Sequence, residues 1–336
     1  MEVDAMDQIA FIVGSVFIYW SSIILTMATA VAVSVFLSLY LRKAENVTAA
    51  AVAVPLAMIL SLVLARLMHW YCRADSYASF GAAMTDYSSG GYALLGVFAG
   101  CALTALILRL TKFSKNLPEM LDCMCLAGGA GIALGRLAAF FNSADRGQVV
   151  ASVRSLPWVY PVTNVVSGVQ EYRLATFLIQ AMVTAVIFAG VFAFYWKTQR
   201  GGKGRDGDTS IIFLLCYGAS QVVLDSTRYD SLFMRANGFV SLVQILGLCG
   251  LVFAIVMFSI RLVKARGFKW FYIAFWVALL ALMGGGGYME YYVQRHGDEA
   301  AFAYRNMGLC LAGIVIITLV IRTLAVSAEW KKEAQE

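Results

Sequence analysis

The sequence predicts an all-α polytopic membrane protein with about nine transmembrane helices. Hydrophobic residues fill 61% of the 336 positions and charged residues only 14%, whereas soluble domains have roughly 45–50% apolar and about 25% charged residues. The apolar residues are gathered into runs near the length of about 20 that crosses a bilayer as a helix. Basic residues cluster in the polar segments between these runs. These three observations predict a chain embedded in a membrane.

Nine stretches are long and apolar enough to span the bilayer. They are Ile9 to Leu41, Val47 to Cys72, Gly90 to Leu110, Glu119 to Phe141, Leu174 to Trp196, Ser210 to Asp225, Phe239 to Val263, Trp270 to Val293 and Ala301 to Val320. The sixth is the shortest. The N-terminal segment "MEVDAMD" is acidic and lacks the basic region and cleavage site of a signal peptide, so we expect the first helix to be retained.

The basic residues predict the orientation, because lysine and arginine near helix ends accumulate on the cytoplasmic side. With the N-terminus outside, every lysine falls in a cytoplasmic segment. We therefore predict a multi-pass membrane protein with an external N-terminus and a cytoplasmic C-terminus. The net charge of +6 is then a collar facing anionic headgroups and gives no indication of a nucleic-acid partner.

The cysteines and the loops suggest no metal or cofactor chemistry. The seven cysteines lie mostly inside predicted spans, and Cys123 and Cys125 stand two apart, on different helix faces. We interpret them as small buried thiols and predict neither a metal site nor a cofactor. Four glycines, Gly284 to Gly287, allow a close helix contact or a bend. The outer connection Asn142 to Arg173, which contains "LPWVYP", is expected to lie on the membrane surface as an aromatic-rich cap.

Three arginines stand at the outer half or outer boundary of predicted spans. Arg66 and Arg136 lie inside the second and fourth spans, and Arg228 closely follows the sixth. A charge in the bilayer costs from about 2.5 kcal/mol upward at the centre, so it is usually retained for a partner or a cavity. Each arginine could snorkel to the headgroups. Alternatively, the three guanidiniums converge into an anion site for a phospholipid phosphodiester, with Asp225 close enough along the helix to hold Arg228.

The segment "GRLAAFFNSADRG", Gly135 to Gly147, resembles the signature G-R-x-G-N-F-x-N-G-E-x-x-G of the prolipoprotein diacylglyceryl transferase family. "YGASQVVLDSTRYD" at 217–230 resembles the family's Y-G-x-x-R-x-x-x-E-x-x-R. Further resemblances follow the family's order: "VGSVFIYW" at 13–20, "ARL" at 65–67, "GGYALLG" at 90–96, Asp122 at the place of the S-D-x-x-A-P aspartate, and "SLVQIL" at 241–246. The similarity covers about Val13 to Val263, seven of the nine predicted helices.

This resemblance implies a domain organisation and an activity. Residues 1–265 would form the family's seven-helix membrane domain, and residues 266–336 would add two transmembrane helices and a short cytoplasmic tail. The family's enzyme transfers a diacylglyceryl group from phosphatidylglycerol to the thiol of the lipobox cysteine of a prolipoprotein, at the outer face of the cytoplasmic membrane. The added helices could mask a lateral opening, bind a partner or simply pack.

The resemblance also implies site residues. Arg136 and Arg228 match the family's two phosphate-site arginines and are the expected catalytic residues. The other expected substrate-binding residues are Arg66, Asn142, Gly147, Asp225 and Gln244.

Several polar positions of the family are replaced in this chain. The replacements are Leu95 for the histidine of G-G-x-x-x-H-G, Ser21 for a tyrosine, Ala139 for an asparagine, Ala144 for a glutamate and Gln221 for an arginine. His69 shares a helix face with Arg66 and could supply the missing base, with His296 and Glu290 as weaker candidates. Three hypotheses stay open: a divergent transferase, a non-catalytic paralogue that binds phospholipid or lipoprotein precursors, and a transporter-like or structural protein whose arginines only snorkel.

Overall fold

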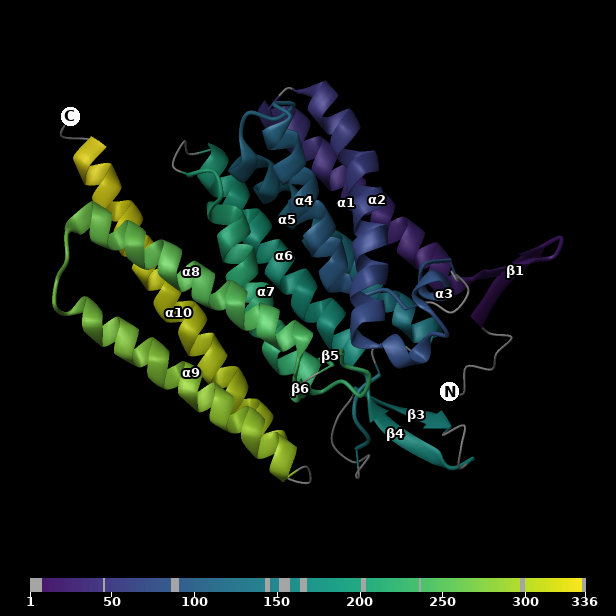
Figure 1. Ribbon diagram of the computed structural model, residues 1–336. Coiled ribbons are helices and arrows are strands. Elements are labelled where there is room, and N and C mark those ends of the chain that lie inside the picture. Colours follow the sequence, from purple (N-terminus) through teal and green to yellow (C-terminus); the bar gives the residue numbers. More distant parts are fainter. Residues whose placement is uncertain are drawn as a thin grey trace. The chain divides into compact units, whose positions relative to one another are not determined.

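The computed structural model confirms an all-α polytopic membrane protein (Figure 1). The structure describes residues 8–44, 46–85, 91–142, 146–150, 158–163, 168–200, 204–235, 237–296 and 300–333. In this part of the chain, eight helices are long and apolar enough to cross a membrane, and the shorter apolar helix Leu94–Leu110 accompanies them. The chain forms two compact units, the first made of Met1–Phe213 and Thr227–Leu242 and the second of Leu214–Ser226 and Val243–Glu336.

The long helices follow the predicted apolar runs closely. They are α1 Trp20–Ala44, α2 Val47–Cys72, α4 Leu94–Leu110, α5 Leu117–Gly135, α6 Thr176–Arg200, α7 Asp208–Ser226, α8 Leu242–Arg266, α9 Tyr272–Arg295 and α10 Ala300–Glu333. The short elements are β1 Ile9–Val13, β2 Val16–Tyr19, η2 Ala74–Ser76, α3 Phe80–Thr85, η3 Arg136–Phe141, β3 Val159–Thr163, β4 Gln170–Leu174, β5 Phe233–Met234 and β6 Asn237–Ser241.

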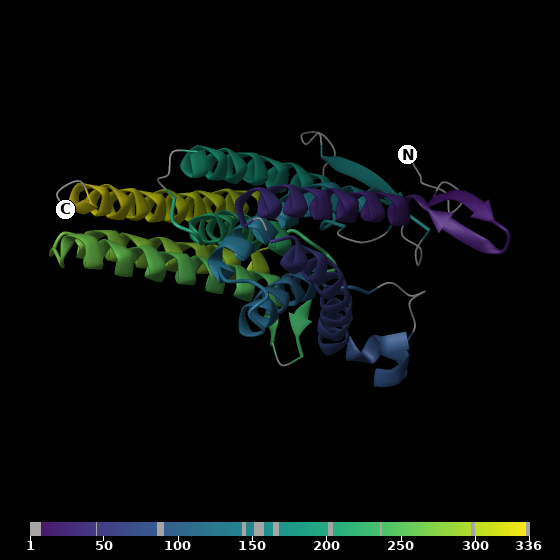
Figure 2. The same ribbon diagram turned by 90° about the horizontal axis from the view of Figure 1, so that it is seen from above.

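The prediction of one helical span from Ile9 to Leu41 is wrong at its start. Residues Ile9–Tyr19 form an antiparallel hairpin of β1 and β2 that extends beyond α1 (Figures 1 and 2). The segment is rich in β-branched and aromatic residues, which favour strands. Gly14 has a φ of +61° at the turn, a conformation that glycine adopts without steric cost. Helix α1 therefore begins only at Trp20.

Other span boundaries also shift by a few residues. The fourth predicted span ends as the 3-10 helix η3, and the seventh begins with strand β6 before α8 starts at Leu242. The expected aromatic cap contains the β3–β4 hairpin, in which Tyr160 pairs with Arg173. Residues 143–145, 151–157 and 164–167 of that connection lie outside the described residues. Gly90, the first residue of the third predicted span, also lies outside them.

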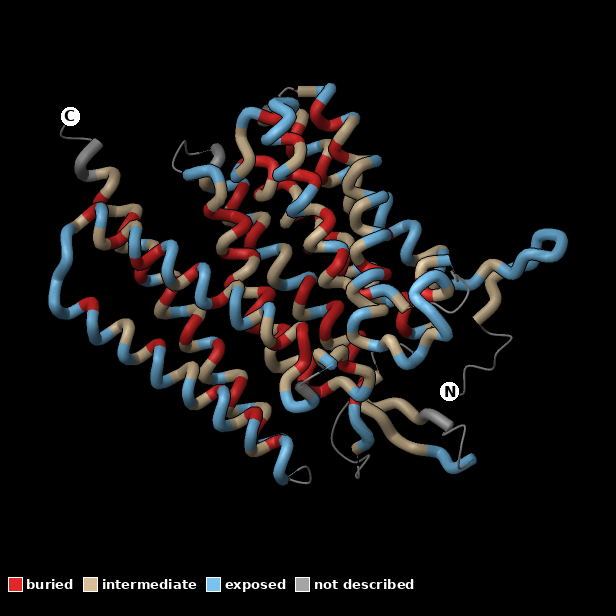
Figure 3. Tube along the Cα trace, viewed as in Figure 1, coloured by how far each residue is buried: buried red, intermediate tan, exposed pale blue. Residues whose placement is uncertain are grey.

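In the first unit, glycines allow α2 and α4 to pack with their backbones close together. A Cβ atom added to Gly96 would lie 2.3 Å from the Cα atom of Ala65, and one added to Gly100 would lie 2.5 Å from the Cα atom of Ser61. Small residues at helix contacts are typical of membrane proteins, because close backbones gain packing without a hydrophobic driving force. Buried residues recur along the helices, with intermediate and exposed residues between them (Figure 3). The two helices therefore form a closely packed pair.

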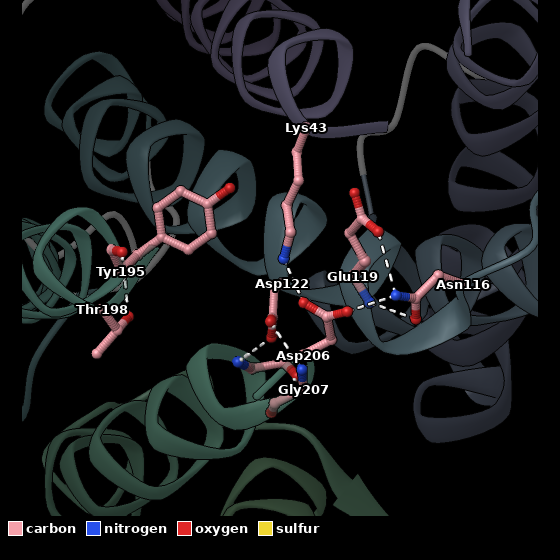
Figure 4. Close-up of polar contacts among 9 residues, drawn as sticks. Lys43, Asn116, Glu119, Asp122, Tyr195, Thr198, Asp206 and Gly207 are labelled. Atoms are coloured by element: carbon pink, nitrogen blue, oxygen red, sulfur yellow. Dashed lines mark hydrogen bonds and ion pairs between the residues drawn. The ribbon is translucent and has the colours of Figure 1, made fainter. Parts of the chain in front are cut away.

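At one end of the first unit, a carboxylate of α5 caps helix α7. The two carboxylate oxygens of Asp122 accept hydrogen bonds from the backbone N–H groups of Gly207, at 2.8 Å, and Ser210, at 2.7 Å (Figure 4). The first N–H groups of a helix have no partner within that helix, and a nearby negative charge favours its positive dipole end. Asp122 is fully buried. It therefore joins the two helices by satisfying donors that would otherwise be orphaned.

A polar cluster surrounds this cap. Lys43 at the end of α1 forms an ion pair with Asp206, and the Asn116 amide donates to both Asp206 and Glu119 (Figure 4). Asn116 also accepts from the backbone N–H of Glu119, which caps α5. The cluster thus fastens α1, α5 and the segment before α7 at one end of the unit.

In the second unit, the glycine run does not break its helix. Helix α9 continues through Gly284–Gly287, and a Cβ added to Gly285 would lie 3.2 Å from the Sγ atom of Cys310 on α10. Of the two alternatives left open by the sequence, close helix contact is the one observed. Helix α10 also contacts α8. Arg261 of α8 donates from Nε and Nη2 to the Glu329 carboxylate of α10. This ion pair fixes α10 against α8.

We expect Asp122→Ala to destabilise the protein, because it leaves the part-buried N–H of Gly207, just before α7, and the buried N–H of Ser210, in its first turn, without their acceptors. Each unsatisfied donor costs about 1–3 kcal/mol. Thermal unfolding of the purified protein in detergent measures the effect as a midpoint lowered by several degrees. Asp75→Asn, which changes an exposed carboxylate in η2, is the matched control. An unchanged midpoint for Asp122→Ala would show that the cap contributes little.

Candidate functional site

Arg136 lies where α5 passes directly into the 3-10 helix η3. Its backbone N–H donates to the carbonyl of Ile132, so the last turn of α5 closes on this residue. Helix η3 ends at Asn142, whose backbone is extended, with φ −139° and ψ −178°. The Arg136 side chain is half-buried. The arginine therefore stands at the end of a membrane-spanning helix rather than in a free loop.

Aromatic side chains hold η3 in place. The ring of Phe141 lies 6.1 Å from that of Trp20 of α1, and the ring of Phe140 lies 6.3 Å from that of Phe177 of α6, both measured between centroids. Ala139 packs into a buried cluster with Ala175 and Phe177. Aromatic pairs at such distances add about 0.5–1.5 kcal/mol each beyond their buried area. The element that begins with Arg136 is thereby packed against two helices.

Arg228 is positioned by backbone pairing with the end of the signature segment. Gly147 and Arg228 form an antiparallel bridge, the Gln148 N–H donates to the Thr227 carbonyl at 3.0 Å, and the Tyr229 N–H donates to the Arg146 carbonyl at 2.9 Å. The Arg228 side chain forms an ion pair with Asp230, with 2.9 Å between Nη2 and Oδ1. Two segments that are about eighty residues apart in the sequence thus form one structure.

Gly147 is required at this crossing by the closeness of its neighbours. A Cβ atom added there would lie 2.4 Å from the Leu174 carbonyl oxygen and 2.7 Å from the Thr176 Oγ1 atom. The Gly147 N–H donates to that same Leu174 carbonyl at 3.0 Å. Residues 146–150 therefore run between the end of β4 and residues 227–229, with space only for glycine at the centre.

Arg173 of β4 completes this network, which we call the arginine network and define as Arg146, Gly147, Arg173, Arg228 and Asp230. The Arg173 guanidinium donates to the Gly147 carbonyl at 3.3 Å and to the Glu171 carboxylate at 3.0 Å. Its central carbon lies 4.6 Å from the centroid of the exposed Tyr229 ring. Such fork-shaped donors match the planar oxygen pairs of carboxylates and phosphates.

A phenol and two hydroxyl groups lie near this network. Burial raises the pKa of Tyr160 on β3, and the charges of Arg146 and Arg173 partly offset that rise. The phenol therefore stays protonated at neutral pH and can donate a hydrogen bond. Next to Gly147 and Arg228, the Oγ1 atoms of the buried residues Thr176 and Thr227 lie 3.2 Å apart. Neutral hydrogen-bond donors thus lie beside the cationic groups of the arginine network.

Arg66 and His69 occupy a different part of the first unit, the last two turns of α2. Arg66 is 2% exposed, and its guanidinium donates to the carbonyls of Ala83 and Gly91. His69 Nδ1 lies 2.8 Å from the Tyr77 hydroxyl. The two residues share a helix face, as the sequence predicts, and both contact the chain between α2 and α4.

Asp225 and Gln244 belong to the second unit. Asp225 lies in the last turn of α7, and Gln244 Nε2 donates to the Val222 carbonyl at 3.0 Å. Of the weaker candidate bases, His296 stacks on Tyr292 with 4.4 Å between ring centroids, and Glu290 is buried and accepts from Gln294. Leu95, at the place of the family's histidine, is half-buried in the first turn of α4. Ala144 lies outside the described residues.

Sequence reasoning assigned no role to several arginines that the structure uses. Arg73 donates to the Ser231 carbonyl at 3.3 Å, and Arg235 donates to the Tyr71 carbonyl at 2.8 Å. A signal was present in the sequence. Apart from His69, the described basic residues in 66–74, 136–150, 170–174 and 227–235 are all arginines, and none is a lysine. Arginine in place of lysine indicates selection for several directed hydrogen bonds rather than for charge alone.

Fold and site together define a multi-pass membrane protein with an arginine-rich set of loops at one end of its helices. The family model for prolipoprotein diacylglyceryl transferase matches residues 8–260. The chain therefore belongs to the prolipoprotein diacylglyceryl transferase family.

Three relatives are named phosphatidylglycerol–prolipoprotein diacylglyceryl transferase. The protein of Finegoldia magna is 25% identical over 71% of this chain and 91% of its own length. That of Lactococcus lactis subsp. cremoris is 26% identical over 77% of this chain and 96% of its own. That of Trichormus variabilis is 27% identical over 73% of this chain and 88% of its own length. Helices α9 and α10 lie beyond the residues that the family model matches.

We expect Gly147→Ala to disrupt the arginine network, because the added methyl group would overlap the Leu174 carbonyl. Such overpacking typically costs about 1–3 kcal/mol. Hydrogen exchange reports it directly, as faster exchange of the Gln148 and Tyr229 amides. Gly190→Ala in α6 is the matched control, since a Cβ there meets nothing within 4 Å. Equal exchange in both variants would contradict the packing described here.

Proposed function

We propose that this chain transfers a diacylglyceryl group from phosphatidylglycerol to the thiol of a prolipoprotein's lipobox cysteine. The observation that carries the proposal is the pairing of Gly147 with Arg228. Gly147 ends the segment 135–147, which resembles one family motif, and Arg228 lies in the segment 217–230, which resembles another. The pairing joins the two segments into one arginine-rich structure. The names of the relatives supply the two substrates.

The cationic groups suit the chemistry of the leaving group. In the reaction, the cysteine sulfur forms a bond to the glyceryl carbon, the bond from that carbon to the phosphate oxygen breaks, and glycerol phosphate departs with an added negative charge. Arg136 and Arg228 would bind the phosphate and stabilise that charge, as preorganised donors do in many active sites. Asp230 orients the Arg228 guanidinium. Asn142, Asp225 and Gln244 are proposed to contact the substrates.

The orientation and the domain boundary complete the proposal. The family's reaction takes place at the outer face of the cytoplasmic membrane, so the arginine network would lie at that face, with the N-terminus outside and the C-terminus in the cytoplasm. Residues 1–265 would form the catalytic membrane domain and residues 266–336 an addition to it. The absence of lysine from the described arginine-rich loops supports this orientation, because lysines accumulate on the cytoplasmic side.

A second candidate function is binding of phospholipid or lipoprotein precursors without transfer. Leu95 favours it, because a leucine side chain can neither accept the thiol proton nor donate a hydrogen bond. General acid–base assistance contributes about 10²–10⁴ in rate. A cationic site without a base would therefore be either a slow enzyme or a binding protein, and a transfer assay distinguishes the two.

We expect Arg136→Ala and Arg228→Ala each to lower transfer about 100-fold or more, since each removes a donor aimed at developing charge. The assay measures radiolabelled diacylglyceryl moved from phosphatidylglycerol to a lipobox peptide by the purified protein. Arg109→Ala, which changes an exposed arginine at the far end of α4, is the control. Transfer that persists in both site variants would refute the proposed clamp. Absence of transfer in the wild type, with Arg136-dependent lipid binding, would select the binding function.

We expect Leu95→His to raise the transfer rate, by up to about 10²-fold, if a missing base limits the reaction. The same labelled-lipid assay measures the gain, and its dependence on pH should follow the titration of the new imidazole. A folded Leu95→His variant with unchanged transfer would show that the missing histidine is not the limit.

His69→Gln in the same assay tests His69 as the replacement base and should lower wild-type transfer if His69 has that role.

A further inference from the structure

The Arg66 side chain is enclosed by the chain that joins α2 to α4. Its Nε atom donates to the Ala83 carbonyl of α3, and its Nη1 atom donates to the Gly91 carbonyl at 3.1 Å. Its guanidinium carbon lies 5.0 Å from the centroid of the Tyr77 ring and 5.3 Å from that of the Tyr92 ring. The Arg66 cation thus contacts residues that follow α2, at 77 and 83, and residues that precede α4, at 91 and 92.

Gly91 is shaped to receive this cation. Its φ is +82°, and an added Cβ would lie 2.4 Å from the Tyr77 hydroxyl and 2.9 Å from Arg66 Nη1. The same Tyr77 hydroxyl lies 2.8 Å from His69 Nδ1. Next to this contact, the Ala93 N–H donates to the Ala65 carbonyl at 3.0 Å. We call the set Arg66, His69, Tyr77, Gly91 and Tyr92 the Arg66 junction.

The energetics of burial explain why so many groups surround Arg66. A buried guanidinium is costly unless acceptors replace the water that it loses. Two carbonyls and two ring faces supply that replacement here, and the side chain is only 2% exposed. The cation can therefore stabilise the returning segment strongly, because separating the two would leave both the guanidinium and the carbonyls unsatisfied.

We propose that Arg66 is a positioning residue, which holds residues 77–85 and 91–93 against α2 rather than binding lipid phosphate itself. The activity part of this proposal rests on the proposed function. The next turns of α2 hold the chain that follows Arg228, because Arg235 donates to the Tyr71 carbonyl and Arg73 to the Ser231 carbonyl. The end of α2 therefore anchors two loops, one through Arg66 and one next to Arg228.

Lysine at this position discriminates positioning from phosphate binding. Arg66→Lys keeps the positive charge, but a lysine ammonium lacks the planar fork that reaches two carbonyls while lying between two rings. If Arg66 positions the loop, lysine should release it. If Arg66 binds phosphate by charge, lysine should retain most lipid binding and leave the loop in place.

Hydrogen exchange of the full-length protein in phosphatidylglycerol nanodiscs tests the positioning role. We expect exchange in 77–85 and 91–94 to rise about tenfold in Arg66→Lys and also in Gly91→Ala, which alters the junction without changing a charge. Tyr77→Phe, which removes only the hydroxyl group at His69, should give a smaller rise and tests the junction if the first two variants fold poorly. Arg109→Lys is the matched control. Exchange unchanged within twofold in the folded variants would overturn the proposal.

Transfer kinetics supply a second, independent result. A loosened loop must be ordered again when substrate binds, so we expect Arg66→Lys and Gly91→Ala to raise KM for phosphatidylglycerol about tenfold with kcat within threefold of the wild type. A large fall in kcat for Arg66→Lys, with unchanged exchange, would instead make Arg66 a direct ligand of the reacting phosphate. If the wild type shows no transfer, the proposed function fails while the exchange result still decides the role of Arg66.

Discussion

Hydrogen bonding of guanidinium groups to backbone carbonyls is the constraint on which the described loop structure of this protein depends. A charged side chain at a membrane boundary must find acceptors within the protein or reach the headgroups. Arg66, Arg73, Arg173 and Arg235 find them in backbone carbonyls of segments that are distant in the sequence, although Arg73 and Arg235 are themselves exposed. Each arginine therefore satisfies its own charge and at the same time fixes a loop, which explains why irregular segments without extensive sheet structure adopt one arrangement.

The sequence predicted the helices well and the loop structure poorly, for a physical reason. Helices in a membrane must satisfy their own backbone groups, so an apolar run of sufficient length is enough to predict one. The β1–β2 hairpin was missed because its residues are as apolar as those of α1, although Gly14 marked its turn. The pairing of Gly147 with Arg228 was not predictable, since its register depends on contacts between distant segments. The partners of Arg66 are backbone carbonyls, which no residue pattern reveals.

The added helices α9 and α10 are fastened within the second unit by specific polar contacts. Arg261 binds Glu329, Trp276 donates to Ser259, and the Tyr304 hydroxyl donates to the Ser226 carbonyl at 3.1 Å. The last carbonyls of a helix have no partner within it, so Tyr304 satisfies an orphaned acceptor at the end of α7. The contact therefore holds α10 against the end of α7 within the second unit. These contacts show how the added helices pack, and their role stays among the three alternatives that the sequence leaves open.

The combination of a retained cationic site with Leu95 is physically coherent, because charge stabilisation and proton transfer make different demands. A guanidinium stays charged at any physiological pH, so its contribution depends on position alone. A general base must in addition have a pKa near the working pH and lie within reach of the thiol. The contacts of Arg173, Arg228 and Gly147 fix position by backbone geometry and do not depend on the residue at 95. The cationic part of the site can therefore persist intact whether or not another group removes the thiol proton, and only the rate of transfer depends on that group.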